Sequence, residues 1–69
     1  MPYATNQTLP VAIRKYLPQQ AQDIYRAAFN AAFATYGHEP TAHRIAWTAV
    51  KRRYVQRAAH VWEARKSHA

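Results

Sequence analysis

Small and apolar residues recur at helical spacing through the middle of the chain, from Pro18 to Tyr36. Two apolar rows run along this stretch, and together they cover more of the circumference than the stripe of an ordinary surface helix. One row is Ala21, Ile24, Ala28 and Ala31 or Ala32, and the other is Tyr25, Phe29, Phe33 and Tyr36. A proline in the first turn and Gly37 just past the end suit the two ends of a helix. The pattern predicts a helix over 18–36 that flanking segments cover on two sides.

A shorter apolar pattern, from Pro10 to Tyr16, precedes the central helix. Its apolar positions on one side are Leu9, Ile13 and Leu17, and the outer side carries Arg14 and Lys15. The hydroxyl of Thr8 can accept an N–H from the first turn, which predicts Thr8 as the N-cap of a helix of about two turns. Because a proline disfavours helix at the residue before it, Pro18 separates this segment from the central helix.

A third apolar pattern follows Pro40, another proline suited to a first helical turn. Its apolar positions are Ala42, Ile45, Ala46, Ala49, Val50 and Tyr54, and its polar side carries Arg44, Thr48, Lys51 and Arg52. The pattern predicts a helix to Tyr54, while helix and strand both stay open for Val61–Trp62. The expected fold is mainly α, a single domain over 1–69. Two longer helices lie roughly antiparallel, and the short first helix packs across them.

The 69 residues contain no cysteine, so the small core must come from helix packing without disulfides or thiolate metal sites. Ten Lys and Arg against three Asp and Glu leave a net charge of +7, which favours acidic partners: nucleic acid, an acidic protein surface or anionic lipid. No apolar run is long enough to span a membrane, and the N-terminus lacks the features of a signal peptide. We therefore expect a cytoplasmic protein without membrane insertion.

Particular residues along almost the whole chain resemble the ChaB family. They are MPY at the start, Leu9-Pro10, Leu17-Pro18, Ala21–Tyr25, Ala28–Asn30, Thr41–His43, Ala46-Trp47, Ala49–Lys51, Tyr54 and Trp62. The resemblance implies a small, mostly helical, non-enzymatic domain from a family named for a proposed regulator of cation/proton antiport, some members of which have been linked with DNA binding. It also implies a small β-pair joining the termini, with Tyr3–Thr5 beside Val61–Glu63. The chain departs from many relatives in its short, non-acidic link between the main helices, residues 37–40.

The polar residues give little support for a metal site or for catalysis. His38 and His43 are five apart across a proline-containing turn, His60 and His68 stand alone, and tight paired spacing is absent. We expect His43 to meet a backbone or tyrosine partner at the start of its helix. The three carboxylates are scattered, and Asp23 suits a structural role near a helix N-terminus, with Arg26 or Arg44 as partner. No cofactor, metal, catalytic residue or small-molecule substrate is therefore predicted.

The basic residues are the remaining candidates for function. Those predicted to bind nucleic acid or another polyanion are Arg44, Lys51, Arg52, Arg53 and Arg57, with Arg14 and Lys15 assisting. In this prediction Arg53 and Arg57 form an i,i+4 pair of like charge, and a solvated, solubilising face is the alternative interpretation. The aromatic rings follow helical periodicity, which favours packing over a stacking platform for bases, except at Trp62. Two further hypotheses are a protein-binding regulator of a cation/proton antiporter and a small subunit of a larger assembly.

Overall fold

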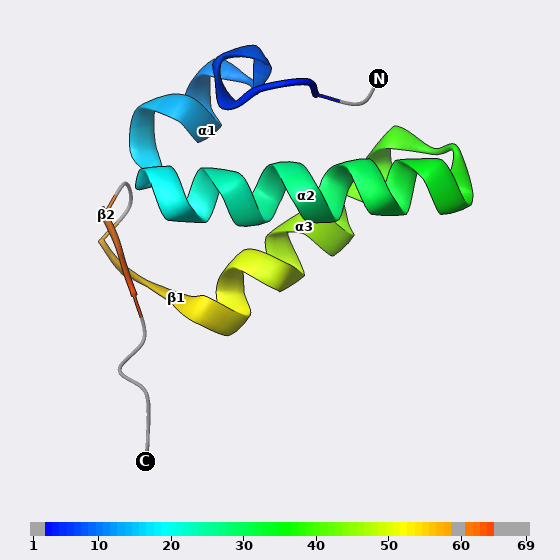
Figure 1. Ribbon diagram of the computed structural model, residues 1–69. Helices are drawn as coiled ribbons and strands as arrows, with labels where there is room; N and C mark the ends of the chain where they lie inside the picture. The colour runs from blue at the N-terminus through cyan, green and yellow to red at the C-terminus, as the bar shows by residue number, and fades with distance from the viewer. Residues whose placement is uncertain (1–2, 59–60, 65–69) are drawn as a thin grey trace.

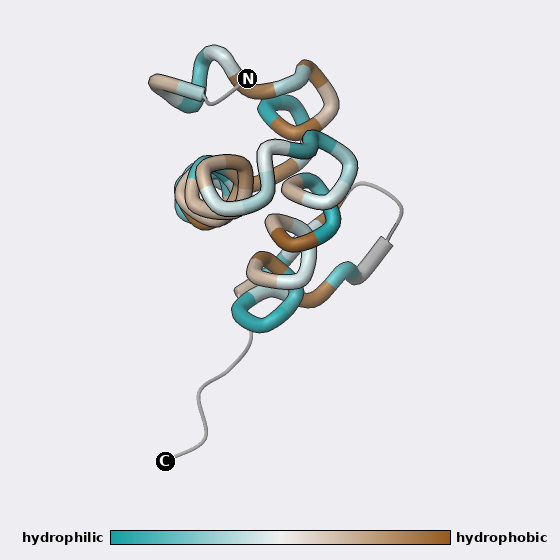
Figure 2. Tube along the Cα trace, turned by 90° about the vertical axis from the view of Figure 1, so that its right-hand side faces the viewer, coloured by the Kyte–Doolittle hydropathy of each residue, from teal (hydrophilic) through white to brown (hydrophobic). Residues whose placement is uncertain are grey.

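The computed structural model describes residues 3–58 and 61–64, and for Arg57 and Ala58 the backbone only. The elements in chain order are the 3-10 turn η1 (Asn6–Thr8), helices α1 (Val11–Tyr16), α2 (Gln19–Tyr36) and α3 (Glu39–Arg53), and strands β1 (Tyr54–Ala58) and β2 (Val61–Ala64). Helix α2 lies between the N-terminal segments and α3, which returns obliquely along it (Figures 1 and 2). The predicted mainly α fold, with two longer helices and one short helix, is confirmed.

Helix α2 forms where the sequence pattern predicts it. Its first residue is Gln19, one later than predicted, because Pro18 is the N-cap, and its C-cap is Gly37 in the left-handed conformation, with φ 64°. The Gly37 N–H donates to the carbonyl of Phe33 at 2.7 Å, which closes the last turn. Because glycine adopts positive φ without a Cβ penalty, the chain reverses here within two residues and begins α3.

The core forms where α1, α2 and α3 meet. Its buried residues are Leu9, Ile13 and Leu17 from the α1 region, Ala21, Tyr25, Phe29 and Ala32 from α2, and Ala42, Ala46, Val50 and Tyr54 from α3 and the residue after it. The alanines let the two long helices approach closely, while Tyr25 and Val50 fill the space between them. Two expected apolar positions are exposed: Tyr36 at 61% and Ile45 at 37%. Ile45 lies at the margin of its apolar row, and Tyr36 is the last residue of α2, where the core ends.

Thr8 is not the N-cap of α1, so that prediction was wrong. The N-cap position belongs to Pro10, and no side chain caps the helix. The Thr8 hydroxyl instead donates to the Thr5 carbonyl at 2.6 Å and accepts from the Thr5 N–H at 3.4 Å. A threonine hydroxyl satisfies its own local backbone more readily than a helix start that lies further along the chain, and here it closes η1.

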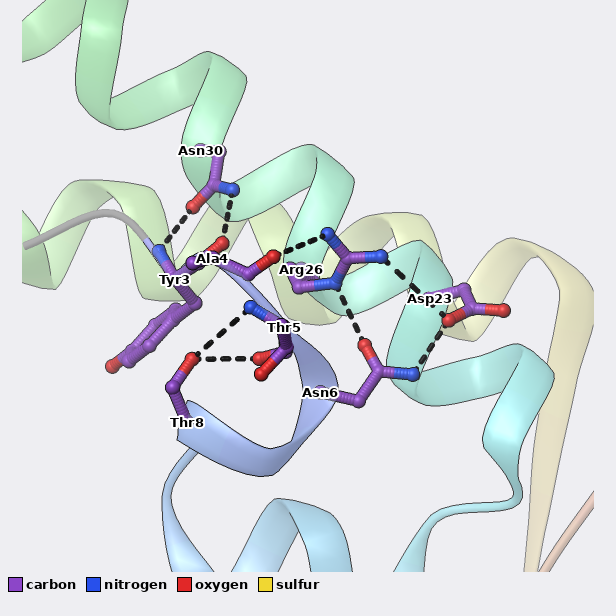
Figure 3. Close-up of polar contacts among 8 residues, drawn as sticks. All are labelled: Tyr3, Ala4, Thr5, Asn6, Thr8, Asp23, Arg26 and Asn30. Atoms are coloured by element: carbon purple, nitrogen blue, oxygen red, sulfur yellow. Dashed lines mark hydrogen bonds and ion pairs between the residues drawn. The ribbon is translucent and has the colours of Figure 1, made fainter.

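The family resemblance implied a strand pairing between Tyr3–Thr5 and Val61–Glu63, and this pairing does not form. The N-terminal segment instead pairs with side chains of α2. The Asn30 carboxamide accepts from the Tyr3 N–H at 2.8 Å and donates to the Tyr3 carbonyl at 2.8 Å. Arg26 donates to the Asn6 side chain at 2.7 Å and to the Ala4 carbonyl at 3.3 Å (Figure 3). One amide side chain thus makes the two hydrogen bonds that a neighbouring strand would have made.

A C-terminal hairpin replaces the predicted β-pair between the termini. Strands β1 and β2 are antiparallel, with Tyr54 opposite Ala64 and Gln56 opposite Trp62, and the register shifts between Gln56 and Ala58. Two nearby strands close with much less loop entropy than two ends of the chain. β-Branched and aromatic residues in both segments also favour the extended conformation. Val61–Trp62, left open from sequence, is strand.

Candidate binding surfaces

Three basic residues of α3, Arg44, Lys51 and Arg52, lie on the side of the helix that faces away from α2, and Arg53 ends the helix in line with its buried row. The buried side is formed by Ala42, Ala46 and Val50. Four residues, Arg44, Lys51, Arg52 and Arg53, are exposed, and we call them the α3 basic surface. No carboxylate occurs in the sequence between Glu39 and Glu63, so the strongest positive charge gathers at the C-terminal end of the helix. Cations at this end also interact favourably with the helix dipole, which is a structural role that needs no ligand.

The predicted i,i+4 relation between Arg53 and Arg57 does not exist. Helix α3 ends at Arg53, and Arg57 lies in β1, where side chains alternate between faces. The side chain of Arg57 lies outside the described part of the chain. Its membership of a polyanion-binding surface stays a prediction, as does that of the other basic residues.

Arg14 and Lys15 are exposed on α1, a different element from the α3 basic surface. The Arg14 Nε donates to the carbonyl of Leu9 at 3.0 Å, which ties this guanidinium to the backbone at the start of α1. The Lys15 ammonium lies 5.5 Å from the centre of the Tyr16 ring, within the range of a cation–π contact. These two cations therefore belong to a different helix from the four on α3.

An apolar groove runs between α1 and the C-terminal hairpin, with a volume of about 220 Å³. Its α1 side consists of Ala12, Ile13, Tyr16 and Leu17, and its other side of Trp47, Gln56 and Trp62. The rings of Trp47 and Trp62 are 5.4 Å apart and inclined at 33°, so the hairpin docks on α3 through these two indoles. The α1–hairpin groove, as we call it, was not predicted. Its one sequence signal was Trp62, an aromatic residue outside the helical pattern.

His43 links the core to this groove. Its Nδ1 contacts the hydroxyl of Tyr25, which confirms the expected tyrosine partner, and its Nε2 accepts from the Trp47 indole N–H at 2.9 Å. An indole N–H can only donate, so Nε2 carries no hydrogen. In a neutral imidazole the hydrogen is then on Nδ1, which donates to the Tyr25 oxygen. This chain of contacts holds Trp47 at the groove.

Tyr25 is fully buried, and its environment disfavours the phenolate. Burial, with a smaller contribution from Tyr3, raises the pKa of Tyr25 from 10.0 to about 12. The Tyr25 ring also meets the edge of the Trp47 ring at 5.8 Å and the His43 ring at 5.6 Å. The hydroxyl therefore stays protonated at neutral pH and serves as a structural hydrogen-bonding group.

The candidate metal and carboxylate residues lie in separate places. Within residues 3–58 and 61–64, no group of three or more His, Cys, Asp or Glu side chains is placed to hold a metal ion. His60 and His68 lie outside the described residues. Asp23 forms an ion pair with Arg26 at 3.9 Å and accepts from the Asn6 amide, which supports the structural role expected for it. Within the same ranges, no helix is sufficiently long and apolar to cross a membrane.

Fold and surfaces together define a small helical module with a C-terminal hairpin, a basic helix surface and an apolar groove. The chain belongs to the ChaB family, whose profile matches residues 9–65. It is 42% identical to the protein named "Putative cation transport regulator ChaB" of Escherichia coli strain K12, over 81% of this chain and 87% of the relative. The protein of the same name from Shigella flexneri matches equally well. The NMR solution structure of the putative cation transport regulator ChaB superposes with a TM-score of 0.85 at 37% identity, covering 94% of this chain and all of that one.

Proposed function

We propose that this ChaB family chain is a non-enzymatic regulatory module that binds DNA, or another polyanion, through the α3 basic surface. The observation that carries the proposal is the clustering of exposed Arg44, Lys51, Arg52 and Arg53 on one helix, without a carboxylate between Glu39 and Glu63. Neutralising phosphates with such a cluster releases counterions, which drives binding irrespective of base sequence. A solubilising surface alone would normally mix both signs of charge. The proposal places the protein in the cytoplasm.

Fluorescence anisotropy with a labelled DNA duplex tests this proposal. At about 50 mM salt we expect micromolar binding that weakens steeply towards about 200 mM, with a log–log slope near −0.9 per phosphate contacted. The double variant Arg44→Gln/Arg52→Gln should bind all duplex sequences more weakly, with a slope shallower by about two.

The matched control is Arg14→Gln/Lys15→Gln, which removes the same charge from α1. A smaller loss of affinity than in the α3 variant would support the α3 basic surface, with α1 assisting. Equal losses would mean that net charge, and no particular surface, determines binding. Absence of binding at low salt with micromolar protein would refute the proposal.

A second candidate function is a protein-binding regulator of cation transport, either alone or as a small subunit of a larger assembly. The relatives carry the name of a cation transport regulator, and the α1–hairpin groove offers an apolar surface of the kind that peptides occupy. This candidate function needs a partner with apolar side chains, whereas binding to the α3 basic surface needs only a partner with negative charge.

A further inference from the structure

The lining of the α1–hairpin groove is almost entirely apolar. Gln56 contributes its one amide side chain, and that residue already has an interaction within the protein. The lining residues also carry two indole N–H groups and the hydroxyl of Tyr16. The Trp47 N–H donates to His43, and Tyr16 has an interaction within the protein. A nucleobase has several hydrogen-bonding edges, and the few polar groups here could replace only part of the water that these edges would lose. An aliphatic or aromatic side chain has no such cost, so the groove favours an apolar occupant.

The groove is preformed. Its floor is Ile13 and Leu17, each only 4% exposed and part of the core. Its far wall is Trp47, which is held by His43 and by the tilted ring of Trp62 at 5.4 Å. A ligand therefore need not order these side chains on binding, which removes part of the usual entropic cost.

Three cations, Lys15, Arg44 and Lys51, lie on the two helices that line this apolar surface. Lys15 lies over the ring of Tyr16, one of the lining residues. On α3, Arg44 comes one turn before Trp47 and Lys51 one turn after it, so both side chains start from the same face of the helix. A ligand with carboxylates on either side of its apolar residue would complement these cations.

The carboxylates of α2 and α3 lie elsewhere. Asp23 pairs with Arg26 beside the N-terminal segment. Glu39 begins α3 and lines a different cavity with His43. Neither lines the groove. A second copy of the chain is a poor occupant, because two molecules of charge +7 repel one another.

We propose that the α1–hairpin groove is a docking site for an acidic peptide segment of a partner protein, which inserts one large apolar side chain between Tyr16 and the two tryptophans. The carboxylates beside this anchor residue lie near Lys15, Arg44 and Lys51. The inference does not depend on DNA binding, although it shares Arg44 and Lys51 with the α3 basic surface. It rests on the second candidate function, for which it names the site and the chemistry of the partner.

Tryptophan fluorescence provides the test, since Trp47 and Trp62 are the chain's two tryptophans and both line the groove. The probe is a short synthetic peptide with a central leucine flanked by aspartates and glutamates. We expect saturable binding that shifts the emission. Replacing the leucine by asparagine, or the acids by their amides, should each weaken binding at least tenfold.

Filling the groove gives a variant that keeps the core side chains. Ala12 is exposed on α1 and lines the groove, so Ala12→Phe should occupy it and weaken peptide binding at least tenfold. The matched control is Val11→Phe, because Val11 is 65% exposed and does not line the groove, and it should bind as the unmodified chain does. Lys15→Glu should weaken binding several-fold. Circular dichroism confirms that each variant is folded.

Several outcomes would overturn this inference. Three concern the peptide: no binding, equal binding by the neutral peptide, or equal binding by Ala12→Phe and Val11→Phe. Two would identify another occupant: concentration-dependent self-association, or tighter binding of a single-stranded oligonucleotide, that Ala12→Phe abolishes. Duplex binding separates the two proposals. A folded chain that binds duplex DNA but no peptide refutes the groove alone, and one that binds peptide but no DNA refutes only the proposed polyanion site.

Discussion

Tyr25 has a different environment at each end of its side chain. The ring is fully buried and stacks on Phe29 with 6.0 Å between centres, while the hydroxyl contacts His43 at the surface of α3. A phenylalanine would fill the same space but leave Nδ1 of His43 without this partner. The residue thus contributes apolar packing and also orients the imidazole that accepts from Trp47.

The raised pKa of Tyr25 makes the folded state sensitive to alkali. Between pH 10 and about 12 the unfolded chain loses this proton while the folded chain keeps it, so the free energy of unfolding falls as pH rises. The loss should approach roughly 2 to 3 kcal/mol. Denaturant unfolding from pH 9 to 12 measures it, with Tyr25→Phe as the control that removes this part of the pH dependence. Identical profiles for the two proteins would contradict the assignment.

At the scale of elements, the sequence predicted helices where local chemistry determines the outcome. Pro18 and Gly37 mark the ends of α2 to within one residue. The end of α3 is different, because the residues after Arg53 include no proline or glycine, and alanines there permit helix as well as strand. The hairpin forms because Tyr54 and Trp62 pack on the core and on Trp47, which are tertiary contacts invisible to periodicity. The groove could not be predicted for the same reason.

The link between α2 and α3 depends on the left-handed conformation of Gly37. A Cβ added there would meet no atom within 4 Å, so Gly37→Ala tests backbone conformation without a steric clash. We expect the free energy of unfolding to fall by about 1 to 2 kcal/mol. Gly37→Asn should lose less, since asparagine tolerates this conformation better. Thermal and denaturant unfolding measure both variants, and an alanine variant as stable as the original would exclude a conformational cost.

At the scale of the molecule, six of the ten basic residues lie on two separate elements, two on α1 and four on α3. The sequence correctly placed Arg44, Lys51 and Arg52 on the outer side of α3, because the apolar positions opposite them have helical spacing. It could not show that Lys15 stands beside the groove, since the groove is made by the hairpin folding back towards α1. Whether any of these cations meets phosphate depends on a partner, which no intramolecular pattern encodes.

The excess of positive charge should make stability depend on ionic strength. Raising sodium chloride from about 10 mM to about 200 mM screens repulsion among exposed cations, and we expect the free energy of unfolding to rise by on the order of 1 kcal/mol. Arg52→Gln/Arg53→Gln should show a smaller rise, because it removes two adjacent charges at the end of α3. Chemical denaturation with urea, which is uncharged, is the measurement. The same rise in both proteins would show that this end of α3 is not a centre of repulsion.

The side chain of Asn30 attaches the N-terminal arm, residues 3–8, to α2, so this arm should open at a lower free energy than the helical core. Leu9 is anchored in the core, but residues 3–8 ahead of it are held to α2 largely by polar contacts of Asn30 and Arg26. We expect such an arm to detach and return while the helices stay folded, so its backbone should exchange hydrogens with solvent through local opening and not through global unfolding. Each detachment also uncovers Phe29, whose ring lies 4.8 Å from that of Tyr3. If the arm opens in this way, its polar contacts determine how often Phe29 meets water.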